Sequence, residues 1–379
     1  MDFAPSPEHE AFRKVVREFA EAEIAPHAAD WDRDHHFPVE TVRKMGDLGL
    51  FGLPFPVEYG GAGSGLLTLS IAIEEIARVD ASMAITLEAA VGLGANPIFR
   101  FGTAEQKQRW LPDLVAGRAL AGFGLTEPEA GSDAGATRTR AELSDGEWVI
   151  NGEKSFITNS GTPITSLVTV TARTGPGEIS AIIVPSGTPG FVADPPYRKM
   201  GWRASDTRGL HFEDCRVPEE NLLGERGRGF RQFLSILDDG RVAIAAMSVG
   251  IAQGCLEQAV AYARERQAFG RPIGANQGTA FRCADMAVAV DAARLLTYRA
   301  AWLHDAGRPF RQEAAIAKLY ASEIAVDASR HATQIFGGYG FVDETPVSRF
   351  YRDAKALEIG EGTSEIQRLI IARGLGLPL

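Results

Sequence analysis

A glutamate stands between two glycines near the C-terminal end of the chain, in the segment IGEGTSEIQR at residues 359–368. Glycines let the backbone adopt unusual φ values and approach a ligand closely. Thr363 or Ser364 can cap the helix that follows, whose free N–H groups suit an anion or a carbonyl oxygen. The segment predicts that Glu361 sits on a sharp turn, where it could move a proton. An ordinary loop with a capping acid explains these residues equally well.

Four further segments combine glycines or hydroxyls with charged and aromatic side chains. LTEPEAGSD (125–133) and FITN (156–159) offer hydroxyls and turns, although turn formers beside a core phenylalanine have the same pattern. RERQAFGRPI (264–273) ends a long helix, where arginines either complement the helix C-terminus or bind a pyrophosphate. QIFGGYGF (334–341) ends a helix in glycines that either cap it or expose N–H groups to a phosphate or adenine. Singly, none of these segments decides a function.

Several familiar catalytic motifs are missing from the sequence. GAGSGL at 61–66 lacks the third glycine of a dinucleotide fingerprint, and the sequence contains no P-loop, no H-E-x-x-H and no G-x-S-x-G. His27, His35 and His36 have no cysteine partners nearby, so we interpret them as surface residues and expect no metal site.

The segments must be positioned by elements that change in character along the chain. Helical spacing of apolar residues up to about 118 predicts an N-terminal α-helical domain over 1–119. Short β-branched runs such as 165–172 and 179–185 predict a β domain over 120–230, with a two-residue hairpin turn at Asn151-Gly152. Long helices near 231–266, 279–305 and 311–335 predict a C-terminal four-helix bundle over 231–379, whose leftover apolar face would suit an oligomer interface.

Composition narrows the class of protein. A formal net charge of −10 argues against nucleic acid as the main partner. Three cysteines without CxxC spacing indicate a reducing compartment rather than a disulfide framework. The first residues lack the apolar run of a signal peptide, and no run reaches the length of a membrane span, so we expect a soluble cytoplasmic protein.

Six segments taken in order resemble the acyl-CoA dehydrogenase family over essentially the whole chain. They are LTEPEAGSD, INGEKSFITN, MGWRASDTRG, RQAFGRPI, QIFGGYGF and IGEGTSEIQR. The resemblance implies an α+β multidomain fold with an N-terminal α-helical domain, a central β-barrel and a C-terminal four-helix bundle. It also implies a homodimer or, as we expect, a homotetramer that binds FAD non-covalently between subunits.

The resemblance also implies roles for particular residues. Glu361 falls on the position of the catalytic base in short- and medium-chain members. The residues implied to bind FAD are Phe123, Leu125, Thr126, Phe156, Thr158, Arg266, Phe269, Gln277, Gln334, Gly337, Gly338, Thr363 and Glu365, some of them from a neighbouring subunit. The residues implied to bind substrate are Ser132, Asp238, Arg241 and Gly362.

Some family branches carry the base on the long helix, at the position of Gly240 here. Glycine supplies no carboxylate, and the preceding Asp239 would point about 100° away on a helix. This arrangement favours Glu361 as the base. The usual family tyrosine before the base is Gly360, which either admits a branched or bulky acyl group or leaves room for a neighbour to fill.

The resemblance implies a reaction of fatty acid β-oxidation. Glu361 would remove the α-proton of an acyl-CoA, a step that requires burial to raise the base's pKa and N–H groups to stabilise the enolate. The β-hydrogen would leave as hydride to flavin N5, giving a trans-2-enoyl-CoA, with an electron-transferring flavoprotein as acceptor. The alternatives are an acyl-CoA oxidase, which a chain of 379 residues disfavours, and a non-catalytic acyl-CoA or flavin-binding protein, which Glu361 disfavours.

Overall fold

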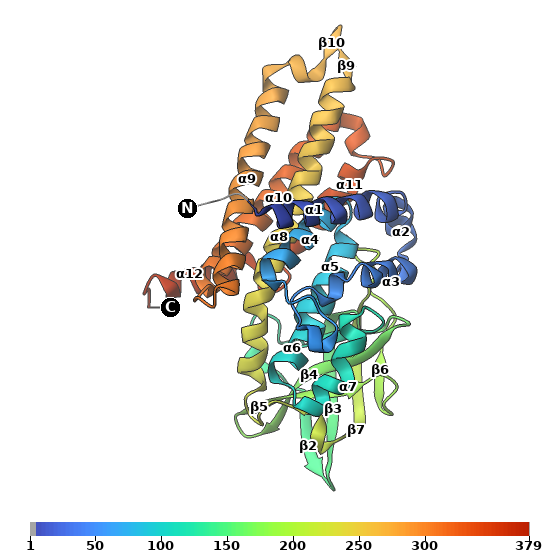
Figure 1. Ribbon diagram of the computed structural model, residues 1–379, viewed down its shortest axis with the longest axis vertical. Helices are drawn as coiled ribbons and strands as arrows, with labels where there is room; N and C mark the ends of the chain where they lie inside the picture. Colours follow the sequence, from blue (N-terminus) through green and yellow to red (C-terminus); the bar gives the residue numbers. More distant parts are fainter. Residues whose placement is uncertain (1–4, 379) are drawn as a thin grey trace.

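A computed structural model describes residues 5–378 of the chain. Figure 1 shows an elongated molecule with a β-rich region at one end and long helices running to the other. The order along the chain is helical, then β, then helical, as the sequence predicts.

The N-terminal part is built of short helices joined by turns. Ser6 caps the first helix by accepting a hydrogen bond from the His9 N–H, and Thr103 forms a capping box with Gln106. The helices are α1 (Pro7–Phe19), the π-helical η1 (Ala20–Ile24), α2 (Ala28–Asp34), α3 (Val39–Asp47), α4 (Gly65–Ala77), α5 (Ala81–Glu88), the π-helical η4 (Ala89–Ala95), α6 (Asn96–Phe101) and α7 (Ala104–Val115). Short 3-10 turns lie at Leu50–Gly52 and Val57–Tyr59.

Helices α4 and α5 form the centre of the molecule, and most of their residues are buried on every side. One stretch, residues 81–101, is long and apolar enough to cross a membrane, but 83% of its apolar window is buried inside the protein. It is therefore explained as a core helix that α4, α8 and the β-rich region cover.

The β region is a mixed eight-stranded sheet in the order β6-β7-β3-β2-β4-β5-β8, with β1 pairing in parallel with β4. Its own apolar core includes Trp148, Ile150 and Val170. The strands are β1 (Leu120–Gly124), β2 (Arg140–Ser144), β3 (Glu147–Thr158), β4 (Thr165–Gly175), β5 (Glu178–Pro185), β6 (Phe191–Ala193), β7 (Thr207–Pro218) and β8 (Leu222–Leu223). Short 3-10 turns lie at Ala134–Ala136 and Glu219–Asn221.

The predicted hairpin turn at Asn151-Gly152 is wrong. Strand β3 continues through these residues, and the register of its pairing with β7 shifts between Ile150 and Gly152, which marks a bulge. The turn that joins β2 to β3 is Asp145-Gly146, with φ of 53° and 80°. Asp-Gly satisfies the positive φ of a type I′ turn as well as Asn-Gly does, so two equivalent signals lay six residues apart.

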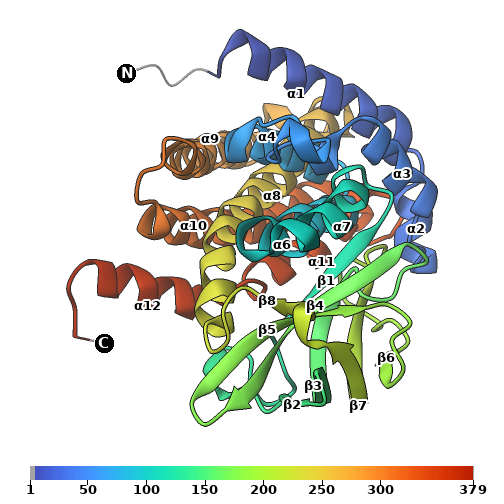
Figure 2. The ribbon, with the colours of Figure 1, turned by 60° about the horizontal axis from the view of Figure 1, so that its bottom comes forward.

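The C-terminal part confirms the long helices. Helix α8 (Gly229–Glu265) has 37 residues and packs against α9 (Gln277–Asp305), α10 (Arg311–Phe336) and the N-terminal α4. The remaining elements are the short hairpin strands β9 (Gln267–Ala268) and β10 (Arg271–Pro272), the 3-10 turns Ile273–Ala275 and Gly337–Gly340, and helices α11 (Pro346–Leu357) and α12 (Ser364–Gly374). Figure 2 shows α12 projecting from the body of the molecule.

Helix α9 leaves an apolar stripe uncovered. Four large side chains spaced seven residues apart are exposed along it: Phe281, Val288, Leu295 and Trp302. Spacing by seven keeps residues near one face of a helix, so the stripe resembles the seam of two packed helices.

Candidate active site

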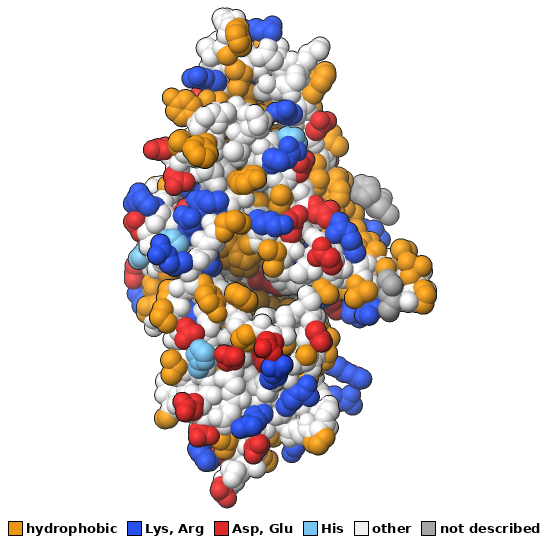
Figure 3. Space-filling model, turned by 180° about the vertical axis from the view of Figure 1, so that it is seen from behind, with side chains coloured by type: hydrophobic (Ala, Val, Ile, Leu, Met, Phe, Trp, Pro, Cys, Tyr) orange, Lys and Arg blue, Asp and Glu red, His pale blue; other side chains and the backbone are white. Residues whose placement is uncertain are grey.

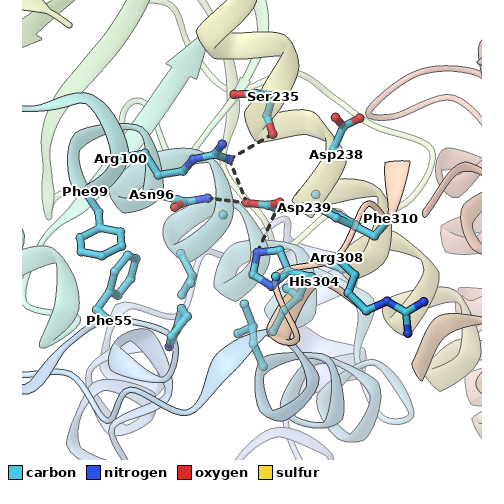
Figure 4. A pocket seen from close by; sticks show the side chains of 18 residues that line it. Phe55, Asn96, Phe99, Arg100, Ser235, Asp238, Asp239, His304, Arg308 and Phe310 are labelled. Atoms are coloured by element: carbon cyan, nitrogen blue, oxygen red, sulfur yellow. Dashed lines mark hydrogen bonds and ion pairs between the residues drawn. The ribbon is translucent and has the colours of Figure 1, made fainter. Parts of the chain in front are cut away.

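A cavity of about 490 Å³ lies where the N-terminal helices meet α8 and the loop between α9 and α10. Its wall comes from α6, α8 and the turn after α9, with aromatic side chains Phe55 and Phe99 on one side (Figure 4). Figure 3 shows that the face opposite to that of Figure 1 is hollowed at mid-height, with hydrophobic side chains around the hollow. The cavity is large enough for a small ligand.

Glu361 lies behind the wall of this cavity. Gly240 on α8 lines the cavity, and an ideal Cβ built on it would stand 1.8 Å from Oε2 of Glu361. Glu361 is only partly buried as a residue, yet both carboxyl oxygens are hidden from solvent and accept no hydrogen bond from a backbone or basic group among residues 5–378. Its φ is 52°, in the left-handed region that a non-glycine residue rarely adopts. The turn predicted at Glu361 is therefore present, with the carboxyl aimed inward.

The loop that carries Glu361 is held from two sides. Nζ of Lys318, a fully buried residue of α10, donates a hydrogen bond of 2.8 Å to the carbonyl oxygen of Gly362. The side-chain amide of Gln367 on α12 donates to the same oxygen, also at 2.8 Å. The Thr363 hydroxyl caps α12 by accepting from the Ile366 N–H at 3.3 Å, while Glu365 is exposed on the first turn.

Burial governs the electrostatics of this carboxyl. Desolvation raises the pKa of Glu361 to about 7, although a hydrogen bond from Glu88 and the charges of Arg241 and Lys318 act in the opposite direction. Burial likewise lowers the pKa of Lys318 to about 8, with Glu361 opposing that change. A carboxylate whose pKa is near neutrality is suited to take a proton from carbon.

The two substrate residues predicted on α8 are Asp238 and Arg241, and the charge of Arg241 acts on Glu361. Asp238 lines the cavity and accepts a hydrogen bond from the buried guanidinium of Arg241. Asp239 points elsewhere, as predicted. It accepts from Asn96 Nδ2 at 3.0 Å, forms an ion pair with Arg100 at 3.3 Å, and faces His304 at 3.7 Å (Figure 4).

The predicted flavin residues of the β region fall into a buried and an exposed group. Phe123 and Leu125 are buried, and the Phe123 ring stacks on Phe233 with 3.9 Å between centroids. Thr126 and Thr158 are half-buried, and Phe156 is 66% exposed with φ of 62°. A strained backbone that presents an exposed aromatic ring is typical of a binding site, and such a ring could stack on a flat ligand.

The loop 125–133 is fixed by a buried ion pair that the sequence did not reveal. Lys154 Nζ donates to Glu127 Oε1 at 2.7 Å, to Thr137 Oγ1 and Thr171 Oγ1 at 3.1 Å each, and to the Leu125 carbonyl at 3.4 Å. Burial lowers the pKa of Lys154 to about 8 against the pull of Glu127. Burial alone would raise the pKa of Glu127, but the charge of Lys154 lowers it to about 2, so both groups are charged at pH 7. Ser132 is exposed on this loop.

A second hollow of about 550 Å³ gathers three predicted cofactor residues, Arg266, Gly337 and Gly338. Its walls are aromatic: Tyr262 stacks on Phe336 at 4.1 Å, and the Arg266 guanidinium lies 5.8 Å from the Tyr339 ring centre. A Cβ at Gly337 or Gly338 would meet nothing within 4 Å, so the space beside their backbone is open. An aromatic hollow with an arginine fits a nucleotide.

The remaining cofactor residues are separated from the flavin group within one chain. Gln277 and Gln334 are exposed, and Phe269 is fully exposed with φ of 51° at the β9–β10 tip. Figure 1 places this tip at the end of the molecule opposite to the sheet that carries Phe156. One chain therefore does not bring the predicted FAD residues together.

Two buried charges near Glu361 were missed in the sequence. Glu88 has no exposed surface and ends α5, and Lys318 is equally buried in α10. Each is a lone charged residue inside an apolar helical run, ASMAITLEAA at 81–90 and AAIAKLYA at 314–321. Charged residues are almost never fully buried without a partner. A single charged residue inside an apolar helical run is therefore a sequence signal for a functional position.

Comparisons with known proteins match the three parts of the chain in order. The N-terminal domain model of acyl-CoA dehydrogenases matches residues 6–118, the middle domain model matches 122–215, and the C-terminal domain model matches 227–376. This chain is a member of the acyl-CoA dehydrogenase family. Its predicted family and fold class are confirmed, with the β domain in the middle.

Full-length relatives agree with the domain models. The chain is 52% identical to a probable acyl-CoA dehydrogenase, YngJ, of Bacillus subtilis, over 99% of this chain and 100% of that protein. It is 49% identical to the mitochondrial short-chain specific acyl-CoA dehydrogenase of Mus musculus, over 96% and 89% of the two chains. The acyl-CoA dehydrogenase is therefore an oxidoreductase that acts on a CH–CH bond, as predicted.

Solved structures resemble this dehydrogenase over its whole length. Butyryl-CoA dehydrogenase from Megasphaera elsdenii matches with a TM-score of 0.96 at 42% identity, covering 100% of both chains. A structure described as the electron transferring flavoprotein of Acidaminococcus fermentans matches with a TM-score of 0.97 at 43% identity, covering 99% of both. A glutaryl-CoA dehydrogenase from Mycobacterium smegmatis in complex with FADH2 matches with a TM-score of 0.95 at 30% identity, covering 99% and 96%. The dehydrogenase is FAD-dependent, and its chemistry is the α,β-dehydrogenation of an acyl-CoA.

Proposed function

We propose that Glu361 is the base that removes the α-proton of a short-chain acyl-CoA. The observation that carries this proposal is the hidden carboxyl of Glu361 at the wall of the cavity, on a turn whose φ of 52° is stabilised by Lys318 and Gln367. The buried carboxyl is more basic than one in water, because desolvation disfavours its charged form.

We assign further roles in the reaction to residues around Glu361. We assign to the N–H groups of the turn at 361–363 the stabilisation of the thioester oxygen as negative charge develops on it. Arg241 and Lys318 are buried cations that stabilise the ionised form of Glu361. Gly240 leaves the space that the carboxyl occupies, which excludes any side chain of α8 from that point.

FAD, when bound, supplies the acceptor for the β-hydride. We assign its flavin end to Phe123, Leu125, Thr126, Phe156 and Thr158, and its pyrophosphate and adenine to Arg266, Phe269, Gln277, Gln334, Gly337 and Gly338. Ser132, Asp238, Arg241 and Gly362 are assigned to the acyl-CoA, and Thr363 and Glu365 complete the cofactor site. The aromatic hollow at Arg266 and the exposed ring of Phe156 support this division.

The enzyme is proposed to be a homotetramer in which one subunit supplies the Arg266–Phe269 end of a site and another supplies the flavin end. The separation of these residues in one chain and the uncovered stripe of α9 support an assembly. We also propose an electron-transferring flavoprotein as acceptor and a cytoplasmic location, with a role in fatty acid β-oxidation.

The proposed base is tested with Glu361→Gln in the purified FAD-loaded enzyme. Gln keeps the volume of the side chain but cannot take a proton, so flavin reduction by acyl-CoA should fall by about 10²–10⁴-fold. Anaerobic titration with straight and branched acyl-CoAs of increasing length, followed by flavin bleaching, identifies the substrate class. Wild-type reduction rates in the variant would exclude Glu361 as the base, and rapid oxygen consumption by the wild type would indicate an oxidase.

A further inference from the structure

Glu88 is a buried acid without a basic partner. It ends α5 where the π-helical segment Ala89–Ala95 begins, and its exposed fraction is 0%. Neither of its carboxyl oxygens accepts a hydrogen bond from a backbone N–H or a basic side chain among residues 5–378. A lone buried carboxylate is strongly disfavoured, so its presence requires an explanation. π-Helical segments frequently occur at functional sites.

The neighbour of Glu88 is Glu361. Each carboxyl group shifts the pKa of the other through a side-chain hydrogen bond, which forms only when one of them holds a proton. Each carboxyl group lies next to a glycine that lines the same cavity. An ideal Cβ on Gly92 would lie 2.9 Å from Glu88 Oε1, and one on Gly240 would lie 1.8 Å from Glu361 Oε2. Two buried carboxyl groups that share one hydrogen bond strongly disfavour being ionised together.

The surrounding charges decide which of the two acids keeps the proton. Two cations face Glu361, Arg241 from α8 and Lys318 from α10, and one further acid, Asp239 of α8, lies near it. Glu88 is influenced by the negative charge of Glu361 and by its own burial. The cations therefore favour the negative charge on Glu361 and the proton on Glu88.

We propose that Glu88 is a positioning residue that keeps its proton at neutral pH and donates a hydrogen bond to the carboxylate of Glu361. This inference rests on the proposed role of Glu361 as the base. During turnover the α-proton goes to Glu361 while Glu88 keeps its own proton, so no additional reactant is needed. The donated bond fixes the direction of the base and limits its basicity.

Two variants of nearly equal volume separate donation from packing. Glu88→Gln retains an N–H donor, and Glu88→Met fills the space without one. In the FAD-loaded enzyme, Gln should keep the acid limb of kcat/KM close to that of the wild type. Met should move this limb upward by about one pH unit, because a hydrogen bond to a charged group is lost. Below the limb kcat/KM should then fall roughly tenfold, and at high pH it should recover.

A purely structural role predicts a different pattern. Packing alone would let Met restore activity as well as Gln, and damage to the fold would lower the rate equally at every pH. Either result would overturn the proposal, as would a Gln variant whose acid limb moves as far as that of Met.

Infrared spectroscopy supplies a readout that does not depend on turnover. Above the pH at which Glu361 ionises, the carbonyl stretch of protonated buried acids should be as strong in Glu361→Gln as in the wild type, and it should weaken in Glu88→Gln. The variants must be compared because other buried acids, such as Asp353 with a pKa raised by burial to about 7, absorb in the same region. A band of unchanged strength in Glu88→Gln would refute a protonated Glu88. A persistent band together with full activity in Glu361→Gln would instead refute the proposed base and leave the protonation of Glu88 supported.

Discussion

Gly240 leaves the space that the carboxyl of Glu361 occupies, and Gly240→Ala tests whether activity requires this position. The added Cβ would stand 1.8 Å from Oε2 of Glu361, whereas Cβ atoms in proteins essentially never approach a heavy atom closer than 3.0 Å. The carboxyl must therefore retreat by at least the difference, 3.0 − 1.8 = 1.2 Å. Because the obstacle is the end of a flexible side chain and not backbone, the fold can absorb the methyl group.

The expected result is a folded enzyme with a misplaced base. A displacement on the order of 1 Å can cost about 10²-fold in rate, which corresponds to roughly 2.7 kcal/mol in the activation free energy. The free energy of unfolding should change little. Alanine in a helix is favoured over glycine by about 1 kcal/mol, and this gain offsets the cost of displacing the Glu361 side chain.

The assay is anaerobic stopped-flow flavin reduction by a short-chain acyl-CoA, with the melting temperature and FAD content measured in parallel. Gly278→Ala is the matched control, because it adds the same methyl to an exposed residue of helix α9 where nothing lies within 4 Å. Wild-type reduction rates in Gly240→Ala, with FAD bound, would show that the carboxyl of Glu361 need not occupy this point.

Three other outcomes follow from the charges of the site and its supporting loop. The acid limb of kcat/KM should lie near pH 7, because burial raises the pKa of Glu361 to about 7 and the proposed base acts only when ionised. A pH profile that is flat down to pH 5 would contradict this. Lys318→Met removes a cation that favours ionised Glu361 and a hydrogen-bond donor to Gly362. The acid limb of kcat/KM should therefore move to higher pH, and the rate at pH values below the limb should fall. An acid limb that does not move would mean that Lys318 has only a packing role. Lys154→Met should destabilise the fold by about 3–5 kcal/mol in chemical denaturation, because Glu127 is left as an unpaired buried charge. The stability that Glu127 contributes in the wild type is present above its ordinary pKa of 4.5 and should be lost as pH falls toward 2, so stability that does not fall over this range would contradict the assignment.

Sequence reasoning succeeded where the signal is local and periodic. The helices near 231–266, 279–305 and 311–335 correspond to α8, α9 and α10 within a few residues, because apolar spacing along a long helix averages over many positions. The turn at Glu361 was also predicted, since two flanking glycines favour it. The hairpin turn was misplaced because Asn151-Gly152 and Asp145-Gly146 carry the same local preference, and only the pairing with β7 distinguishes them.

Contacts between distant segments could not be predicted in this way. Glu88 and Glu361 lie far apart in sequence, and their proximity depends on how α5 packs against α8 and on the turn before α12. The absence of a side chain at Gly240 was interpreted as the lack of a rival base, whereas its geometric role as the space for Glu361 required coordinates. Among the described residues, a Cβ at Gly360 would meet Ala356 O at 3.5 Å and Trp202 Cη2 at 3.8 Å, which is ordinary van der Waals contact, so this position has room for a Cβ.

The separation between the β9–β10 tip and the sheet that carries Phe156 has a genetic consequence. If each site takes its two halves from different subunits, a variant damaged at Phe269 and another damaged at Glu361 fail for different reasons. Mixed assemblies of the two would contain some sites built from the two undamaged halves. Two inactive alleles could then complement each other in one cell, and co-expression would restore a fraction of the activity that neither allele has alone.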